Sequence, residues 1–426
     1  MTSPSDTTSR LSTWRPFGRL ALVAGILFSQ LSRFSVRTKL NAALACLLAS
    51  IVAAGCSGAV QEVRDVDPVG SVVDPTIRRL MAEHAIPGMA VAVIVDGKPH
   101  FFDYGVASKS EGAPVDDDTL FEVGSLSKTF TATLAGYAQA RGTLSLSDPA
   151  STHWSALHGT AFDRISMLQL GTYSAGGLPL QFPAEADTPE SMLGYFRHWD
   201  PSYPPGSRRL YSNPSLGLFG YLAARSLGGS FADLLQNTLL PQLGLDNTYL
   251  QIPSNEMAHY AQGYTKTGAP TRVTPGALDA ETYGIKTTTH DLVQFVTAAM
   301  QPEGRDDPWR RAIETTQTGY YRVNGMTQGL GWEIYPQPVT ETALIAGNSD
   351  AMASQPPPIE WLDTPSPPDP SALFNKTGST NGFGSYVAYI PQKRLAVILL
   401  ANKNYSNSAR VDAAYRILDS VGHVAE

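Results

Sequence analysis

Two β-rich segments at opposite ends of the chain constrain its fold more than any other feature. The first, MAVAVIVDGKPHFFDYGVAS at residues 89–108, has two apolar runs joined by Asp-Gly, which is a strong hairpin signal. The second predicts strands at Phe383–Ile390 and Leu395–Ala401, followed by a final helix at about Ala409–Val421. We therefore expect an α/β protein of the α+β type, with one antiparallel sheet built from both ends of the chain and flanked by helices.

The middle of the chain predicts an inserted, mainly helical part. With 42% apolar and 16% charged residues, the composition is that of a folded globular protein. We expect residues 60–426 to form a single domain, with an α/β lobe from about 60–140 and 270–426 and a helical lobe from about 141–269. The Pro-rich segment 354–371 predicts an extended surface loop. Helices are predicted at 75–86, 128–141, 167–173, 216–226, 231–239 and 289–300.

Residues 1–59 have the features of an export segment. Basic residues at 37 and 39 precede an apolar run, Leu40–Ala54, and small residues follow, which is the order found in a secretory signal peptide. Cleavage after Ala59 would leave a periplasmic protein, whereas cleavage before Cys56 would give a lipoprotein attached to the membrane through that cysteine. An earlier apolar stretch, Leu20–Leu31, means that the signal is unusually long or that translation starts later, and a membrane anchor is the remaining alternative.

The charge distribution and the cysteines exclude several classes of partner. The whole chain has a net charge of −7, but residues 1–59 hold six basic residues and one acid. The remainder has 25 basic and 37 acidic residues, a net charge of −12. Such an acidic body has no electrostatic footprint for nucleic acid or for an anionic membrane. Both cysteines, Cys46 and Cys56, lie in the export segment, so we expect no disulfide and no thiolate metal site in the body.

A Ser-x-x-Lys motif is the first candidate for chemistry. Ser125 and Lys128 open a predicted helix, where a spacing of three residues places a hydroxyl and an amine on one face. A lysine whose pKa is lowered by burial and by other cations can take the proton of a serine nucleophile. The helix N-terminus adds free N–H groups that favour an oxyanion. Alone the motif is weak, because a capped helix with an exposed lysine has the same spacing.

Two further motifs make a catalytic interpretation stronger. Tyr211 and Asn213 are two residues apart, so in a short extended loop both side chains can point the same way. Lys376-Thr377-Gly378 precedes a Gly-rich approach to a strand, whose edge could present a lysine, a hydroxyl and backbone N–H groups. Core packing for the tyrosine and a solvated charge for the lysine are the alternatives. A second Lys-Thr-Gly, at residues 266–268, lacks such a strand and predicts a surface turn.

These motifs resemble those of class C β-lactamases, the serine cephalosporinases, within the β-lactamase and penicillin-binding protein superfamily. The likeness covers nearly all of the chain from about residue 75 to the C-terminus. It runs through TYSAGGLPLQFP (172–183), RLYSNPSLGLFGYLA (209–223), LDAETYGIKTT (278–288), QGLGWE (328–333), NKTGSTNGFGSYVAYIP (375–391) and LANKNYSNSARVDAA (400–414). Asn381 stands where many relatives have Gly, which leaves the substrate profile more open than the reaction.

The resemblance implies a role for each residue of these motifs. Ser125 would be the acylated nucleophile, with Lys128 and Tyr211 as the proton-handling pair. Lys376 would stabilise the phenolate of Tyr211 and help to dock the substrate carboxylate. The backbone N–H groups of Ser125 and Ser379 would form the oxyanion hole. The residues implied to bind substrate are Gln181 and Asn213 at the acyl-side amide, Tyr283 as a wall of the acyl pocket, Thr377, Asn407 and Arg410 at the carboxylate end, and Gly378.

The predicted reaction is hydrolysis of the β-lactam ring through an acyl-serine intermediate. We expect the enzyme to be a periplasmic monomer that needs no cofactor and no obligate protein partner. No metal is expected, because the eight histidines form no metal-ligand pattern. Two alternatives share the same motifs. One is a D,D-peptidase or serine esterase of the same fold, and the other is a penicillin-binding sensor that is acylated without turnover.

Overall fold

We analysed a computed structural model of the chain, which describes residues 67–424. The described residues belong to one compact unit. The predicted export segment, including Cys46 and Cys56, lies outside the described residues. None of the described helices is both long enough and apolar enough to cross a membrane.

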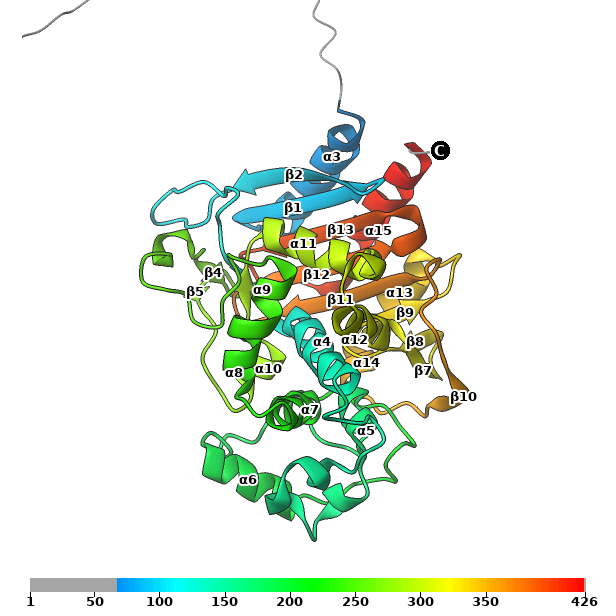
Figure 1. The fold of residues 1–426 in the computed structure, drawn as a ribbon. Helices are drawn as coiled ribbons and strands as arrows, with labels where there is room; N and C mark the ends of the chain where they lie inside the picture. Colours follow the sequence, from blue (N-terminus) through cyan, green and yellow to red (C-terminus); the bar gives the residue numbers. More distant parts are fainter. Residues whose placement is uncertain (1–66, 425–426) are drawn as a thin grey trace, which may run out of the picture. The chain divides into compact units, whose positions relative to one another are not determined.

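A nine-stranded antiparallel sheet forms the main layer (Figure 1). Its order is β10-β7-β8-β9-β11-β12-β13-β1-β2, so the first strands along the chain pair with the last. These strands are β1 (Gly88–Val95), β2 (Lys98–Gly105), β7 (Gly319–Val323), β8 (Met326–Gln328), β9 (Glu333–Tyr335), β10 (Glu360–Ser366), β11 (Leu373–Ser379), β12 (Gly384–Ile390) and β13 (Leu395–Ala401). The expected sheet built from both ends of the chain is confirmed.

Successive side chains of the central strands point to opposite faces of the sheet, which divides the hydrophobic core into two layers. In β1, Met89 and Val91 face one layer, and Ala90 and Ala92 face the other. Helices α3 (Pro68–His84) and α15 (Asn407–Val424) pack on the first face, and α11 (Thr289–Met300) packs on the second. Both faces of the sheet are covered, which explains why β1, β12 and β13 are almost continuously apolar.

Of the remaining helices, α13 (Glu341–Gly347) contacts α15 on the first face, whereas α8 (Phe231–Leu234) and α9 (Leu240–Leu243) contribute to the core on the second face (Figure 1). Helices α5 to α9 fall within residues 141–269, which the sequence assigns to a helical lobe; the division into two lobes stays a prediction. The helices are α4 (Ser127–Ala140), α5 (Met167–Gly171), α6 (Pro189–His198), α7 (Asn213–Ser226), α8 (Phe231–Leu234), α9 (Leu240–Leu243), α10 (Asp279–Thr282), α12 (Asp307–Gln317), α13 (Glu341–Gly347) and α14 (Asp350–Ser354). The short strands are β3 (Phe121–Glu122), β4 (Gly263–Tyr264), β5 (Pro270–Thr271) and β6 (Lys286–Thr287).

The Pro-rich segment 354–371 is not wholly a loop, and that prediction is wrong. Strand β10 lies within it and pairs with β7 at the edge of the sheet, where Trp361 is opposite Tyr321. The register shifts between Trp361 and Ser366, so pairing is interrupted along the segment that contains Pro365. Proline is tolerated on an edge strand because one side of the backbone has no strand to bond.

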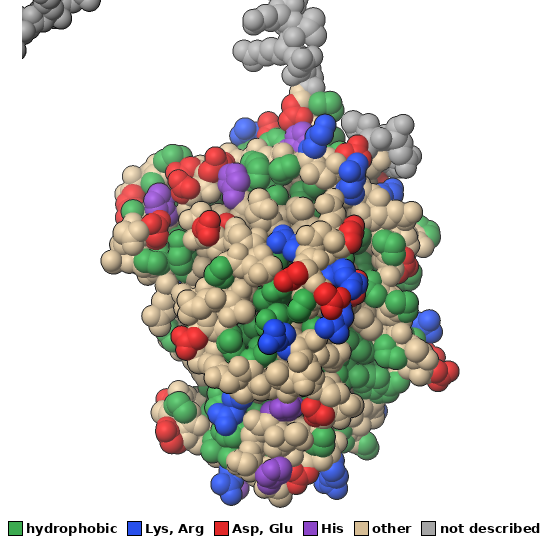
Figure 2. Space-filling model, in the orientation of Figure 1, with side chains coloured by type: hydrophobic (Ala, Val, Ile, Leu, Met, Phe, Trp, Pro, Cys, Tyr) green, Lys and Arg blue, Asp and Glu red, His purple; other side chains and the backbone are tan. Residues whose placement is uncertain are grey.

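Charges of both signs are interspersed on the surface. On the face shown in Figure 2, Lys and Arg side chains lie among Asp and Glu rather than in one continuous basic patch. On α12, for example, Arg310 and Arg311 both pair with Asp307, and Arg310 also pairs with Glu314. These pairs are exposed, so each contributes little to stability, about 0–1 kcal/mol.

Candidate active site

Ser125 lies in a 3₁₀ turn, Gly124–Leu126, directly before α4. Gly124 has a φ of +52°, and a Cβ there would lie 2.5 Å from the carbonyl oxygen of Ser379. A Cβ at Gly378 would overlap the carbonyl oxygen of Val123. The two glycines therefore allow the end of β11 to approach the Ser125 turn until the two backbones are in contact.

Lys128, on the first turn of α4, reaches back to Ser125. Its Nζ donates hydrogen bonds to Ser125 Oγ at 2.9 Å and to the backbone oxygen of Thr282 at 2.8 Å. The side chain is fully buried. Burial lowers the pKa of Lys128 to about 8, assisted by the charge of Lys376 and partly opposed by Tyr211. Roughly one tenth of the amine is therefore neutral at pH 7, and the fraction that can accept a proton rises toward pH 8.

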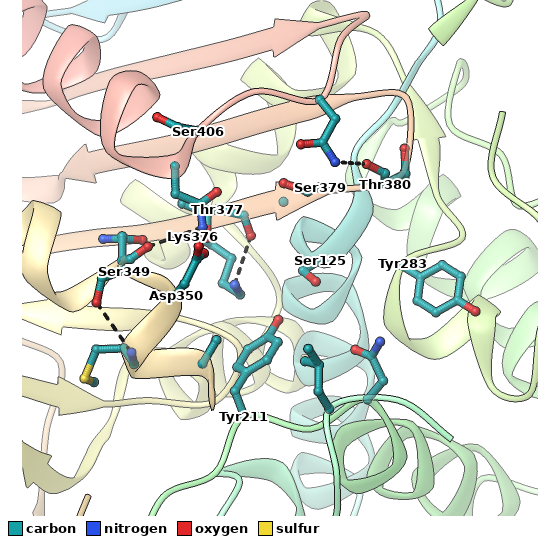
Figure 3. A pocket seen from close by; sticks show the side chains of 18 of the residues that line it. Ser125, Tyr211, Tyr283, Ser349, Asp350, Lys376, Thr377, Ser379, Thr380 and Ser406 are labelled. Atoms are coloured by element: carbon teal, nitrogen blue, oxygen red, sulfur yellow. Dashed lines mark hydrogen bonds between the residues drawn. The ribbon is translucent and has the colours of Figure 1, made fainter. Parts of the chain in front are cut away.

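Tyr211 lies just before α7, and its ring packs between two amines. The Nζ atoms of Lys128 and Lys376 lie 5.2 and 5.0 Å from the ring centroid. The hydroxyl points into the space between Ser125 and Lys376 (Figure 3). It is buried, and no hydrogen bond to it is found among residues 67–424. Burial raises the pKa of Tyr211, but the two lysine charges outweigh burial and lower the pKa to about 8.

The end of β11 presents an open backbone edge to the same space. Strand β9 pairs with β11 only as far as Asn375, whereas β12 pairs with it through Ser379. From Thr377 to Ser379 the other edge of β11 therefore has no strand partner among the described residues. Lys376 Nζ donates to the backbone oxygen of Thr377 at 2.9 Å. Such an edge offers N–H and C=O groups to an extended ligand.

Gln181, Asn213 and Tyr283 also face this space. Asn213 Nδ2 donates to Gln181 Oε1 at 2.9 Å. Asn213 Oδ1 is buried, and within the described part of the chain nothing donates to it, so this amide keeps an acceptor available. Tyr283 follows α10 and lies apart from Tyr211, on the far side of Ser125 (Figure 3).

These residues surround one cavity of about 780 Å³, which is large enough for a small-molecule ligand. Among the residues predicted from sequence, those that line it are Ser125, Gln181, Tyr211, Asn213, Tyr283, Lys376, Thr377, Gly378, Ser379 and Asn407; Asn381 does so too. Lys128 lies directly beneath Ser125, without lining the cavity. The structure thus brings together residues that lie up to 282 positions apart in the chain.

Arg410 is the exception, and its predicted contact with substrate is not supported. The side chain is fully buried and does not line the cavity. Its guanidinium donates to the backbone oxygens of Gly378, Ser385 and Tyr405 and to Ser379 Oγ. Arg410 therefore supports the end of β11 from behind.

The buried pair Arg209–Glu333 is a part of the site that the sequence analysis missed. Arg209 lies 3.1 Å from Glu333, and its guanidinium lies 5.7 Å from the centroid of the Tyr211 ring. It also donates to Gln328 Oε1 and to the backbone oxygen of Met352. A charged residue two positions before Tyr211 was the available signal, but its burial depends on packing between distant segments.

The second Lys-Thr-Gly is an exposed turn between β4 and β5, as predicted. Lys266 nevertheless lines the rim of the cavity. Within residues 67–424, no group of three or more His, Cys, Asp or Glu side chains is arranged to hold a metal ion.

Comparisons with known proteins agree with this geometry. The β-lactamase family model matches residues 73–422. A β-lactamase of Pseudomonas fluorescens is 56% identical over 353 residues, which are 83% of this chain and 99% of that protein. A β-lactamase of Escherichia coli strain K12 is 42% identical over 378 residues, which are 88% of this chain and 98% of that protein.

Two solved structures have the same fold. A β-lactamase/D-alanine carboxypeptidase from Pseudomonas syringae has a TM-score of 0.81 at 46% identity, covering 82% of this chain and 98% of its own. A class C β-lactamase mutant has a TM-score of 0.81 at 43% identity, covering 84% and 99%.

Fold and site together define a serine enzyme of the β-lactamase and transpeptidase type. The chain belongs to the β-lactamase family, and the class C resemblance seen in the sequence is confirmed.

Proposed function

We propose that this serine β-lactamase hydrolyses cephalosporins and penicillins through an acyl-Ser125 intermediate and thereby confers β-lactam resistance. The observation that carries the proposal is the 2.9 Å hydrogen bond between Lys128 Nζ and Ser125 Oγ, in a cavity that also holds Tyr211 and Lys376. A serine hydroxyl beside a base of lowered pKa is an activated nucleophile.

Acylation begins when Ser125 Oγ attacks the lactam carbonyl carbon and its proton passes to the Lys128–Tyr211 pair. The carbonyl oxygen becomes an oxyanion, which the backbone N–H groups of Ser125 and Ser379 stabilise. Each such donor is worth about 100- to 1,000-fold in rate. The lactam C–N bond then breaks, the nitrogen takes a proton from the pair, and the acyl group remains on Ser125.

Deacylation repeats these steps with water as the nucleophile. Water attacks the ester carbonyl carbon and gives one proton to the Lys128–Tyr211 pair. The carbonyl oxygen becomes a second oxyanion, which the N–H groups of Ser125 and Ser379 again stabilise. The ester C–O bond breaks, and Ser125 Oγ recovers the proton from the pair. The product is the ring-opened acid, and the enzyme returns to its starting state without a cofactor.

The cavity walls orient the substrate along β11. Gln181 and Asn213 bind the acyl-side amide, and Tyr283 forms the wall beside the acyl side chain. At the other end Lys376, Thr377, Gly378 and Asn407 hold the carboxylate end of the substrate. Asn381, at the turn that follows β11, adds a polar side chain near this edge and tunes the substrate profile.

A D-alanine carboxypeptidase is the second candidate, because one similar solved structure carries both names. A serine esterase or a non-hydrolytic penicillin-binding sensor would use the same residues. The intact Lys376-Thr377-Gly378 and the match along nearly the whole domain favour the lactamase.

Turnover of cephalothin and nitrocefin, compared with a p-nitrophenyl ester and a D-Ala-D-Ala peptide, tests the assignment. We expect lactam hydrolysis to dominate. Rapid ester or peptide cleavage without any lactam turnover would reject the assignment as a β-lactamase. A cephalosporin adduct on Ser125 that persists without turnover would instead identify a sensor.

We also propose that the enzyme acts as a periplasmic monomer on small-molecule β-lactams. The basic, apolar and small residues of segment 1–59 support export. The intact mass of the mature protein tests this, because cleavage after Ala59 and lipidation at Cys56 give different masses. Light scattering of the purified protein measures its oligomeric state, and a stable dimer would contradict the monomer.

A further inference from the structure

Five charged side chains line the cavity, and one of its two carboxylates has no partner among residues 67–424. Arg209, Lys266 and Lys376 are its basic residues, and Glu333 and Asp350 are its acidic ones. Glu333 is buried and paired with Arg209 at 3.1 Å. The Asp350 side chain has no hydrogen bond and no ion pair with any residue between 67 and 424. Asp350 is thus a carboxylate in the cavity wall that remains available to a ligand.

The backbone around Asp350 is held in place, although the side chain is exposed. Asp350 is the first residue of α14, which Ser349 caps by accepting a hydrogen bond from the Met352 N–H. Asn407 Nδ2 donates to the backbone oxygen of Asn348 at 3.3 Å, which links this turn to α15. The negative charge therefore has a defined place in the wall.

Asp350 lies at the end of the cavity where the substrate carboxylate would bind. Figure 3 shows Asp350 beside Ser349 and on the same side as Thr377, whereas Tyr283 lies on the opposite side of Ser125. In a cephalosporin, the substituent at the 3-position is attached to the ring carbon next to the one that carries the carboxylate. A substrate whose carboxylate binds near Thr377 and Asn407 would therefore hold this substituent at the end of the cavity that Asp350 lines.

We propose that Asp350 is a specificity-determining residue that favours β-lactams with a cationic substituent beside the carboxylate and disfavours those with an anionic one. This inference rests on the function proposed above, because it uses the same orientation of substrate along β11. Attraction to one charge and repulsion of the other both contribute to discrimination between substrates.

The size of the effect follows from the exposure of the carboxylate. Opposite charges a few ångströms apart in a wet cavity attract weakly, and the resulting preference is about three- to tenfold in kcat/KM. Ions screen it, because the Debye length shortens from about 10 Å at 0.1 M to about 3 Å at 1 M. The preference is therefore expected to shrink as salt is added.

Cephaloridine and cephalothin provide a matched pair of substrates. They have the same acyl side chain, but the 3-substituent carries a pyridinium in cephaloridine and an uncharged acetoxy group in cephalothin. The quantity to measure is kcat/KM for cephaloridine divided by kcat/KM for cephalothin, at 0.05 M and 0.5 M NaCl. We expect Asp350→Asn to lower this quotient about three- to tenfold at low salt, and Asp350→Glu to retain it.

Asp363→Asn is the matched control, because Asp363 is an exposed carboxylate on β10 that does not line the cavity. The kcat/KM quotient of Asp363→Asn for cephaloridine over cephalothin should equal that of the unsubstituted chain. A quotient that Asp350→Asn leaves unchanged, while both cephalosporins are still hydrolysed, would overturn this inference and leave the proposed function standing. Absence of turnover by the unsubstituted chain would overturn both.

Discussion

Two lysine amines determine what the Tyr211 phenol can do near neutral pH. Burial raises the pKa of the fully buried Tyr386 and Tyr389 well above the usual value for tyrosine. Tyr211 is also buried, yet its pKa is lowered to about 8, because Lys128 and Lys376 lie beside it. The amine of Lys128 has its pKa lowered to about 8 as well. The two groups titrate as a coupled pair that holds and releases protons together.

We predict that kcat/KM for cephalothin falls as the pH drops below about 8. The Lys128–Tyr211 pair must lack a proton to accept one from Ser125, and the pair gains that proton below this pH. The fall should approach tenfold per pH unit well below pH 8. Tyr211→Phe should reduce kcat/KM about 100- to 10,000-fold. A pH profile that is flat between pH 6 and pH 9 would contradict this role.

Removing the charge of Lys376 should move this pH dependence in a defined direction. Lys376 lowers the pKa of Tyr211, so in Lys376→Gln the acidic limb of the kcat/KM profile should shift to higher pH. Lys376→Arg keeps the charge and should keep the limb near its original position. Lys266→Gln, which removes an exposed charge at the cavity rim, is the control. An unshifted limb in Lys376→Gln would show that Lys376 does not tune Tyr211.

At the scale of elements, the proposed oxyanion site depends on the contact between the Ser125 turn and β11. Gly124 and Gly378 allow the two backbones to meet, and the Ser385 hydroxyl adds a hydrogen bond to the Val123 oxygen at 2.8 Å. Arg410 holds the same strand end from behind. The position of the Ser379 N–H relative to Ser125 thus depends on three separate elements.

Gly124→Ala should damage both activity and stability. An alanine at a φ of +52° is strained by about 1–3 kcal/mol, and its Cβ would displace the backbone of Ser379. We expect the free energy of unfolding to fall by about that amount and kcat to fall about 100-fold, as for loss of one oxyanion donor. Gly194→Ala, in α6 with open space around the Cβ position, should be neutral or slightly stabilising. Near-normal kcat in Gly124→Ala would contradict the close contact.

The elements with long, consistent patterns could be predicted from sequence, and the short ones could not. Strand β13 and helix α11 have the predicted bounds, because β13 is an uninterrupted apolar run and α11 keeps apolar residues at helical spacing. Strands β7 to β9 are three to five residues long, too short for periodicity to be recognised. Strand β10 was hidden by its prolines, which only an edge position makes acceptable.

The same holds for the active-site residues, because only those within a local sequence motif could be predicted. Ser125, Lys128, Tyr211 and Lys376 each belong to a short local motif, so the sequence could identify them before any geometry was known. Arg410 was assigned to the substrate because its burial depends on packing between α15 and β12, which no local pattern reports. Arg209 was missed for the same reason. Asp350 is exposed, and its place in the cavity wall depends on the tertiary fold.

At the scale of the whole molecule, buried ionisable groups make folding stability depend on pH. Glu281, in α10, is 5% exposed, and burial raises the pKa of its carboxyl from 4.5 to about 8. The folded state therefore holds a proton that the unfolded state releases above pH 4.5. The stabilising contribution of the neutral carboxyl is complete below pH 4.5 and is lost progressively as the pH rises toward 8.

Glu281→Gln should remove this dependence, because glutamine stays neutral. We expect the free energy of unfolding of Glu281→Gln, relative to the unsubstituted protein, to increase from pH 5 to pH 7 by up to about 1.4 kcal/mol per pH unit. Urea denaturation at several pH values measures it. Glu303→Gln, which removes an exposed carboxylate, is the matched control. If the free energies of unfolding of Glu281→Gln and of the unsubstituted protein differ by the same amount at every pH, the Glu281 carboxyl is ionised in the folded protein.

The central claim is that Ser125 carries the acyl group during turnover. The most direct test is rapid quenching after mixing with cephalothin, followed by intact mass measurement and peptide mapping. We predict a transient adduct on the peptide that contains Ser125, which decays as hydrolysis proceeds and is absent from a folded but inactive Ser125→Ala protein. An adduct on a different residue, or hydrolysis by Ser125→Ala at close to the normal rate, would contradict the account.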